Sequence, residues 1–236
     1  MGRAEFADEL FEFDLLDGAR STLLGKRLKS LPALMPFWTI EQYRELDFRL
    51  WSPDYECPRT GRYMKHSWMG DRYLHEFGHV LATREVMDLL ANQLSGVGPV
   101  LDAGCGSGYL ARELARLGVE SFAVDSGDDS LPIHQRDAQG DAVAHVSNLF
   151  GAVLVTWPPF NEPFAVDVAR AMVPGQFLIY EGENGGGCTA DSGFFDYVSD
   201  QGCWQRRFDL SDALDAVHLT FSMNRDHWLI FRKVAP

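Results

Sequence analysis

Residues 100–125 read VLDAGCGSGYLARELARLGVESFAVD, and this stretch decides the fold. A short apolar run ends in Asp102. Three glycines follow it at alternate positions: Gly104, Gly106 and Gly108. Leucines then recur at helical spacing as far as Gly118, a typical helix stop, and a second apolar run ends in Asp125. The pattern predicts a strand, a glycine loop, an amphipathic helix and a second strand of a parallel α/β unit.

The glycine loop and the second aspartate have the spacing of a nucleotide site. Glycines lack a β-carbon, so the backbone of such a loop can approach a ligand closely. Asp125 comes 21 residues after Gly104, at the end of the next strand. A carboxylate at that place can accept hydrogen bonds from both hydroxyls of a ribose. We therefore expect a nucleoside-containing cofactor to bind over this loop.

The chain from residue 73 to 236 alternates between helical and strand patterns. Thr83 is expected to cap a helix that ends near Leu94. Further strands are predicted at 152–160 and 176–183, and further helices at 162–175 and 192–201, with Asp191 as a cap. Residues 218–223 and 227–234 are predicted to form a closing hairpin. This order predicts a Rossmann-like α/β fold, doubly wound, with a mostly parallel seven-stranded sheet and an antiparallel end.

Residues 1–72 have a different texture, rich in aromatic side chains and broken by prolines. Short helices with loops are expected there, for example from Ile40 to Leu50. We predict a mainly helical extension or lid in front of a core of residues 73–236. Trp38, Trp51 and Trp68 suit a lid, although structural packing explains any one of them better.

The composition limits the classes of function. The 236 residues are 46% hydrophobic and carry a formal net charge of -13, which disfavours general attraction to nucleic acid. No apolar run is long enough to span a membrane, and the amino terminus does not resemble a signal peptide. The four cysteines form no C-x-x-C pair, so reduced thiols and a cytoplasmic location are expected. Basic residues cluster early, at Arg20–Lys29 and again at Arg59–Arg84.

The run D-A-G-C-G-S-G resembles the first motif of class I S-adenosylmethionine (SAM)-dependent methyltransferases. Nicotinamide and flavin enzymes instead carry G-x-G-x-x-G. The resemblance implies that Asp102 lies near the methionine end of SAM and that Asp125 holds the ribose. Residues Gly104 to Gly108, including Cys105 and Gly106, would pass under the cofactor. Asp141 would lie near the adenine, with Asp137 as the rival residue.

The run TWPPF, Thr156 to Phe160, ends a predicted strand where ligands bind in open parallel sheets. Methyltransferases that act on amines carry a polar residue, then Pro-Pro and an aromatic residue, and here Trp157 holds the polar place. We place Thr156 with the cofactor, and Trp157, Pro158 and Phe160 around the acceptor pocket. The alternative is an ordinary proline turn.

A closer resemblance joins WPPF to the later run YEGENGGGCTADSGFF. Together they resemble a poorly characterised group of predicted methyltransferases with Trp-Pro-Pro-aromatic and Gly-Gly-Cys-Thr motifs. This likeness runs from about Phe77 to the end and implies the fold and the cofactor, without an acceptor. It would place Glu181, Glu183, Cys188 and Thr189 beside the cleft, unless they only build a glycine-rich loop.

The run YLHEFGHVLA, residues 73–82, contains the H-E-x-x-H pattern of zinc proteases. The third ligand that a zinc site needs is missing from both usual places downstream. Moreover, His75 and His79 share a face only if one helix runs from Tyr73 to Leu94, which the predicted cap at Thr83 opposes. We therefore predict no metal centre, and we place His79 beside the acceptor as a candidate base.

These residues favour methyl transfer from SAM to a nitrogen or oxygen atom of a small molecule. Two alternatives fit the same pattern. The enzyme could act on an exocyclic amine of nucleic acid through the early basic cluster, or the chain could bind SAM without catalysis. Zinc proteolysis is disfavoured by the missing third ligand.

Overall fold

The computed structural model describes residues 37–44, 54–57, 62–65, 73, 77–127, 133–185, 187–220 and 224–235. The chain divides into two compact units, Met1–Met35 with Asp47–Arg72, and Pro36–Leu46 with Tyr73–Pro236. In the first unit the described residues form an antiparallel hairpin, β1 (Asp54–Cys57) with β2 (Arg62–Lys65). The sequence did not indicate this hairpin. The early basic cluster as far as Lys29, Trp51, Trp68 and His75 lie outside the described residues.

The second unit is built on a seven-stranded sheet in the order β5-β4-β3-β6-β7-β9-β8. Its strands are β3 (Val100–Ala103), β4 (Ser121–Asp125), β5 (Ala138–Gln139), β6 (Ala152–Thr156), β7 (Phe177–Glu183), β8 (Trp204–Arg206) and β9 (Asp226–Lys233). The first five strands in this order, β5, β4, β3, β6 and β7, pair in parallel. Strand β9 runs antiparallel to both β7 and β8. The predicted fold class, mostly parallel with an antiparallel end, is confirmed.

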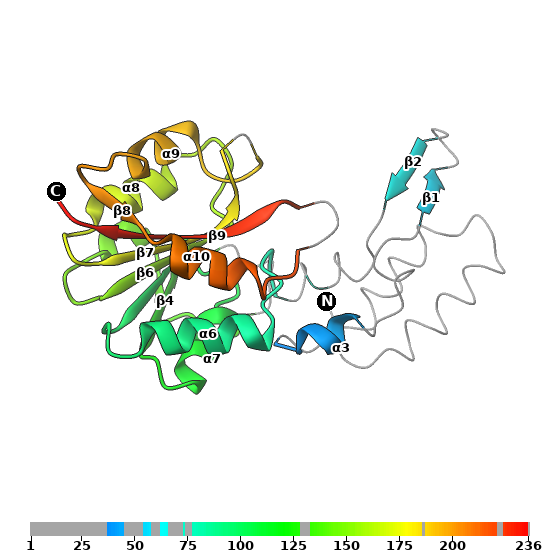
Figure 1. Ribbon diagram of the computed structural model, residues 1–236, viewed down its shortest axis with the longest axis horizontal. Coiled ribbons are helices and arrows are strands. Elements are labelled where there is room, and N and C mark those ends of the chain that lie inside the picture. Colours follow the sequence, from blue (N-terminus) through cyan, green and yellow to red (C-terminus); the bar gives the residue numbers. More distant parts are fainter. Residues whose placement is uncertain are drawn as a thin grey trace. The chain divides into compact units, whose positions relative to one another are not determined.

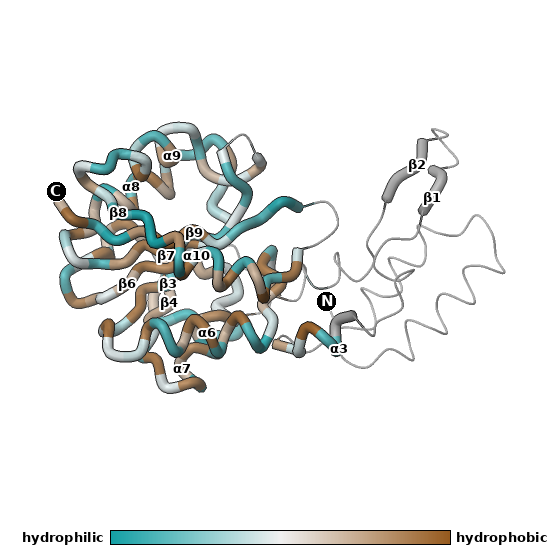
Figure 2. Tube along the Cα trace, in the orientation of Figure 1, coloured by the Kyte–Doolittle hydropathy of each residue, from teal (hydrophilic) through white to brown (hydrophobic). Residues whose placement is uncertain are grey.

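Helices cover both faces of this sheet, as Figure 1 shows. They are α6 (Arg84–Leu94), α7 (Tyr109–Arg116), α8 (Phe164–Ala171), α9 (Ser192–Val198) and α10 (Phe208–Asp215), with the 3-10 helix η1 (Ala142–His145) and the short α3 (Ile40–Arg44). Helices α8 and α9 contact each other on one face, and α6 contacts α7 and α10 on the other. The central strands are therefore buried on both sides and are hydrophobic along their length (Figure 2). No helix among the described residues combines the length and hydropathy needed to cross a membrane.

Helix α6 begins where the sequence predicts. The hydroxyl of Thr83 accepts a hydrogen bond from the backbone N–H of Val86, at 3.2 Å, and donates one to the carbonyl of Val217, at 3.1 Å. The segment that precedes Thr83, from Phe77 on, is not helical. A single helix from Tyr73 to Leu94 is therefore wrong, and Thr83 joins the start of α6 to the segment after α10.

We expect Thr83→Ala to lower the free energy of unfolding by about 1 to 2 kcal/mol, because it removes a helix cap that is fully buried. Urea unfolding followed by circular dichroism measures the change. Thr83→Ser keeps the hydroxyl and should recover most of the loss. An unchanged midpoint in the alanine variant would contradict the role of the cap.

The end of the sheet differs from the predicted hairpin. Residues 218–220 lie in no strand, and β9 pairs instead with β7 and β8. The sequence does not predict β8, whose three residues are too few to show a strand period, or α10 directly after it. The predicted cap of α9 is confirmed, since Asp191 accepts a hydrogen bond from Phe194 N–H at 2.8 Å.

A buried lysine fixes the last strand to helix α8. Lys233 is 2% exposed, and its ammonium group donates hydrogen bonds to the carbonyls of Ala169 and Arg170 and to the hydroxyl of Tyr197. A cation at the C-terminal end of a helix satisfies carbonyls that the helix itself leaves unpaired. The C-terminal end of β9 is thereby joined to α8 and α9.

Candidate functional site

The predicted site residues gather at one edge of the sheet. The carboxyl ends of β3, β4, β6 and β7 meet there, together with the amino end of the antiparallel β9. The chain order reverses between β3 and β6, because β4 and β5 extend to one side of β3 while β6 and β7 extend to the other. Open α/β sheets bind ligands at such a switch point, which makes this edge the candidate site.

The glycine loop adopts a backbone that suits only glycine. Gly104, Gly106 and Gly108 all have positive φ angles, of 71°, 53° and 70°. A β-carbon on Gly108 would lie 1.8 Å from the carbonyl oxygen of Gln135, and one on Gly104 would lie 3.0 Å from the ring of Phe164. The loop therefore packs closely on two neighbouring segments, and its conformation is fixed before any ligand binds.

Asp125 holds the loop from the next strand. One carboxylate oxygen accepts a hydrogen bond from Gly106 N–H at 2.8 Å, and the other accepts one from Gly127 N–H at 3.0 Å. A carboxylate has about four acceptor positions, so both oxygens keep capacity for a further donor. Asp125 thus joins the glycine loop to the end of β4 and can still accept hydrogen bonds from a bound hydroxyl pair.

Asp102 is buried in β3, directly before the glycine loop. It is 1% exposed, and neither of its oxygens makes a hydrogen bond of normal geometry with the described residues. Burial raises the pKa of Asp102 to about 7; the nearby N–H of Ala111 opposes the shift, and the charge of Asp125 adds to it. Burial also raises the pKa of the Cys105 thiol, and the charges of Asp102 and Asp125 add to the effect. Cys105 is therefore a packed thiol and not a nucleophile at neutral pH.

The raised pKa of Asp102 gives a stability prediction. In the unfolded chain the pKa of an aspartate is about 3.9, so between about pH 4 and pH 7 Asp102 is protonated in the folded protein and ionised in the unfolded chain. The folded protein therefore loses stability as the pH rises through that window. We expect Asp102→Asn to remove this loss. Between pH 5 and pH 7 the unfolding free energy of the variant should gain about 2 to 3 kcal/mol relative to the parent protein.

Urea unfolding at several pH values measures the difference. Asp212→Asn removes an exposed carboxylate from α10 and serves as the control, with a pH dependence close to that of the parent protein. Parallel curves for the parent and Asp102→Asn would contradict the raised pKa.

Asp141 and Asp137 have different surroundings. Asp137 accepts hydrogen bonds at 2.8 Å from Ala123 N–H and from the side chain of Gln135, so it holds β4 in place. Asp141 is exposed and caps η1 through Val143 N–H at 2.9 Å. It borders an open hollow of about 610 Å³ that Phe164 also lines. Phe164 is also the ring that a β-carbon on Gly104 would meet, so it lies between the hollow and the glycine loop. Asp141, unlike Asp137, lines this hollow.

The TWPPF segment brings two predicted residues together. Strand β6 ends at Thr156, which pairs with Glu181. Trp157 takes the left-handed conformation, with φ of 45°, and its N–H donates to the carbonyl of Glu181 at 2.8 Å. The ring of His79 stacks on the Trp157 ring with the centroids 4.7 Å apart. The environment beside the Trp157 ring partly desolvates His79 and lowers its pKa, and the charge of Asp226 opposes this shift. The rest of the His79 side chain is exposed to solvent.

The two prolines and Phe160 are less closely involved. Pro158 is buried, and its carbonyl accepts a hydrogen bond from Ala190 N–H at 3.3 Å, so this acceptor is already used within the fold. Phe160 is 55% exposed. The proline pair fixes the turn after β6 onto the loop that follows β7.

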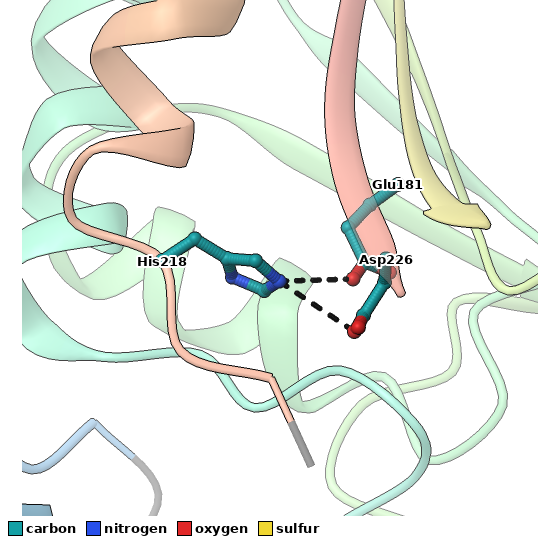
Figure 3. A group of neighbouring side chains, drawn as sticks. All are labelled: Glu181, His218 and Asp226. Atoms are coloured by element: carbon teal, nitrogen blue, oxygen red, sulfur yellow. Dashed lines mark ion pairs between the residues drawn. The ribbon is translucent and has the colours of Figure 1, made fainter. Parts of the chain in front are cut away.

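Three ionisable side chains meet at this edge, of which the sequence pointed only to Glu181. Glu181 on β7, Asp226 on β9 and His218 after α10 point toward one another (Figure 3). The Nε2 atom of His218 lies 3.6 Å from Glu181 and 3.5 Å from Asp226. We call these three residues the acid–histidine cluster. Asp226 could have been noticed as a charged residue opening an otherwise apolar strand, but nothing near His218 in the sequence marks it.

Comparisons with known proteins add likenesses of fold. No protein-family model matches the sequence, and neither does a curated protein. Among solved structures, an rRNA methylase from Streptococcus thermophilus aligns over 63% of this chain and 94% of its own, with 15% identity and a TM-score of 0.42. A TehB-like SAM-dependent methyltransferase from Corynebacterium glutamicum aligns over 63% and 87%, with 17% identity and a TM-score of 0.41.

Human N-acetylserotonin methyltransferase in complex with SAM aligns over 63% of this chain and 51% of its own, with 14% identity and a TM-score of 0.40. At such identities and TM-scores the assignment of function depends on the residues of this chain.

Proposed function

We propose that this protein transfers a methyl group from SAM to a nitrogen or oxygen atom of a small molecule. The observation that carries the proposal is the glycine loop at the switch point, with Asp102 before it and the Asp125 carboxylate bound to it. This arrangement offers a closely approachable backbone for a nucleoside and an acceptor for its ribose. When bound, SAM supplies a methyl group on a positively charged sulfur.

The charge of the site supports a cationic cofactor over a dinucleotide. SAM carries a sulfonium and an ammonium group, whereas a dinucleotide would bring a pyrophosphate to the glycine loop. Asp102 and Asp125 flank that loop, and Asp141 faces the adjoining hollow. Among the described residues at the loop, Arg136 provides a positive charge, through a hydrogen bond to the carbonyl of Gly106 at 3.2 Å. Asp125 and Asp141, together with the partly ionised Asp102, favour a positively charged ligand.

Residues of the chain would bind and orient both reactants. Gly104 to Gly108 and Asp125 would hold the nucleoside, and the hollow beside Asp141 has room for an adenine. The stacked His79 and Trp157 at the end of β6 would border the acceptor. Methyl transfer needs the acceptor atom in line with the methyl group and water excluded, so catalysis would depend mainly on this positioning.

Two measurements test the proposal. Calorimetry should show binding of SAM and of S-adenosylhomocysteine, and no binding of a nicotinamide dinucleotide. Methyl-labelled SAM is then incubated with the protein and a cell extract separated into small molecules, nucleic acid and protein. Label in the small-molecule fraction is the expected result, and label in nucleic acid would show the alternative acceptor. SAM binding without any labelled fraction would indicate a binding protein.

A further inference from the structure

Six buried polar atoms at the end of β6 and β7 make no hydrogen bond of normal geometry with the described residues. They are Nε1 of Trp157, both carboxylate oxygens of Glu181, Nε2 of His218 and both carboxylate oxygens of Asp226. A buried polar group that lacks a partner costs about 1 to 3 kcal/mol. Folded proteins keep few of them, so this concentration indicates that another molecule completes the hydrogen bonds.

The acid–histidine cluster is closed to solvent and loosely spaced. Glu181 is 0% exposed and Asp226 is 2% exposed, and the His218 side chain is 3% exposed. The distances of 3.5 and 3.6 Å from His218 Nε2 exceed those of direct N–H···O bonds, which are about 2.7 to 3.2 Å. Glu181 and Asp226 lie on one face of the pair β7 and β9, since Glu181 is opposite Trp228, two residues after Asp226.

A metal ion is the first ligand to consider, because two carboxylates and an imidazole within 4.8 Å of one another could ligate one. The other nitrogen of His218 argues against it. Nδ1 of His218 is 3.2 Å from Nε1 of Trp228, and an indole nitrogen can only donate. Nδ1 must therefore accept, and the imidazole carries its hydrogen on Nε2. A protonated Nε2 cannot bind a metal ion, and it points at the carboxylates as a donor.

The two carboxyl groups of the cluster differ in pKa. Burial raises the pKa of Glu181 well above its usual range, and the charge of Asp226 adds to this shift. Burial would also raise the pKa of Asp226, but interactions with His218 and then with Glu181 keep it below its usual range. Glu181 therefore holds its proton more firmly than Asp226, and Asp226 is the carboxylate of the pair.

A buried site with a carboxylate and free acceptor oxygens fits a group that donates N–H bonds. We infer that the acid–histidine cluster binds the amino group of the methyl acceptor, so that the acceptor is an amine. This inference rests on the proposed methyl transfer. An alcohol would offer a single O–H and would leave more of the buried oxygens without a partner.

The chemical step balances with these groups. The lone pair of the neutral amine nitrogen forms a bond to the methyl carbon as the carbon–sulfur bond breaks and its electrons stay on sulfur. The product is a methylated ammonium ion and S-adenosylhomocysteine. The Asp226 carboxylate balances the charge of this ammonium ion, which leaves the site and gives its proton to water. Glu181 stays protonated throughout, and its O–H group donates a hydrogen bond to Asp226.

The stacked His79 and Trp157 lie next to this cluster. The indole of Trp157 interacts with Glu181, and the charge of Asp226 acts on His79. Trp157 is half-buried, and its left-handed backbone is costly for a residue other than glycine. Because the cluster itself is closed, an amine reaches it only when one of these two rings moves. The rings would then pack on the apolar part of the acceptor.

The test uses the full chain with methyl-labelled SAM and a small-molecule extract separated by cation exchange. Unreacted SAM is also a cation, so its position is marked with a sample that lacks the protein. Label should appear in further compounds that the exchanger retains at neutral pH, as amines are. Asp226→Asn removes the carboxylate that faces the ammonium product and should reduce this transfer about 100-fold. Glu181→Gln and His218→Gln change groups that also contact the amine, and each should reduce the transfer about tenfold.

Separate readouts distinguish the failures. SAM affinity by calorimetry should be unchanged in all three variants and reports that they fold, and Asp209→Asn, an exposed carboxylate at the start of α10, is the charge control. Label only in neutral or acidic compounds overturns the amine and leaves methyl transfer intact. Equal transfer by Asp226→Asn and the parent overturns the role of Asp226, and an equal loss in Glu181→Gln overturns the assigned charge.

A bound transition metal at one ion per chain, found by elemental analysis and lost in His218→Gln, also overturns the inference in favour of a metal site. Failure to bind SAM at all would instead count against the proposed function.

Discussion

Gly108→Ala is expected to destabilise the folded protein by about 3 kcal/mol and to abolish measurable SAM binding. The φ angle of 70° costs a residue with a β-carbon about 1 kcal/mol, and the new carbon would lie 1.8 Å from the Gln135 carbonyl oxygen. Relieving that overlap means moving the backbone of the loop or of its neighbour, at a further cost of about 2 kcal/mol. Urea unfolding and calorimetry measure the two effects.

Gly118→Ala provides a matched control at the other end of α7. Its φ angle is 88°, but a β-carbon there would meet no atom within 4 Å. This variant should lose about 1 kcal/mol from backbone strain alone and bind SAM normally. If both variants lost the same stability, the close approach of Gly108 to Gln135 would have no energetic weight.

Asp125→Ala is expected to weaken SAM binding at least 100-fold. Hydrogen bonds from two ribose hydroxyls to a carboxylate are worth about 3 kcal/mol together, which corresponds to that factor. The variant also removes the acceptors for Gly106 N–H and Gly127 N–H, so the loop loses support from β4. Titration calorimetry with SAM measures the loss.

A comparison of two ligands separates the ribose from the charge. S-adenosylhomocysteine has the same ribose and no sulfonium charge, so Asp125→Ala should weaken both ligands by the same factor. A loss confined to SAM would mean that Asp125 acts through its charge and that the ribose lies elsewhere. Asp125→Asn, which keeps one carbonyl acceptor, should fall between the parent protein and the alanine variant.

The cofactor half of the site could be predicted because it is local in the sequence. The glycine loop, Asp102 and Asp125 all fall within 26 residues, and each has its role from its place on a strand end or a turn. Thr83 and Asp191 are equally local, since a cap bonds to an N–H three residues on. Short-range geometry of this kind leaves a pattern that one sequence shows.

The acceptor half could not be predicted, because its residues meet only through the pairing of strands. His79 and Trp157 are 78 residues apart and come into contact through the packing at the end of β6. His218 and Asp226 join Glu181 because β9 returns antiparallel beside β7. The predicted hairpin gave β9 a different neighbour, and with it the position of Asp226 was lost. Glu181 was noticed only as the end of a strand.

The position of β9 between β7 and β8 has a consequence for the order of folding. Strand β8 precedes β9 in the chain, yet among the described residues its pairing is with β9 alone. Strand β8 therefore has no neighbour to pair with until β9 has joined the sheet. The five parallel strands, β5, β4, β3, β6 and β7, must pair before that. Long-range pairing of this type is slow, and the outer strand should be the first to open in native-state hydrogen exchange.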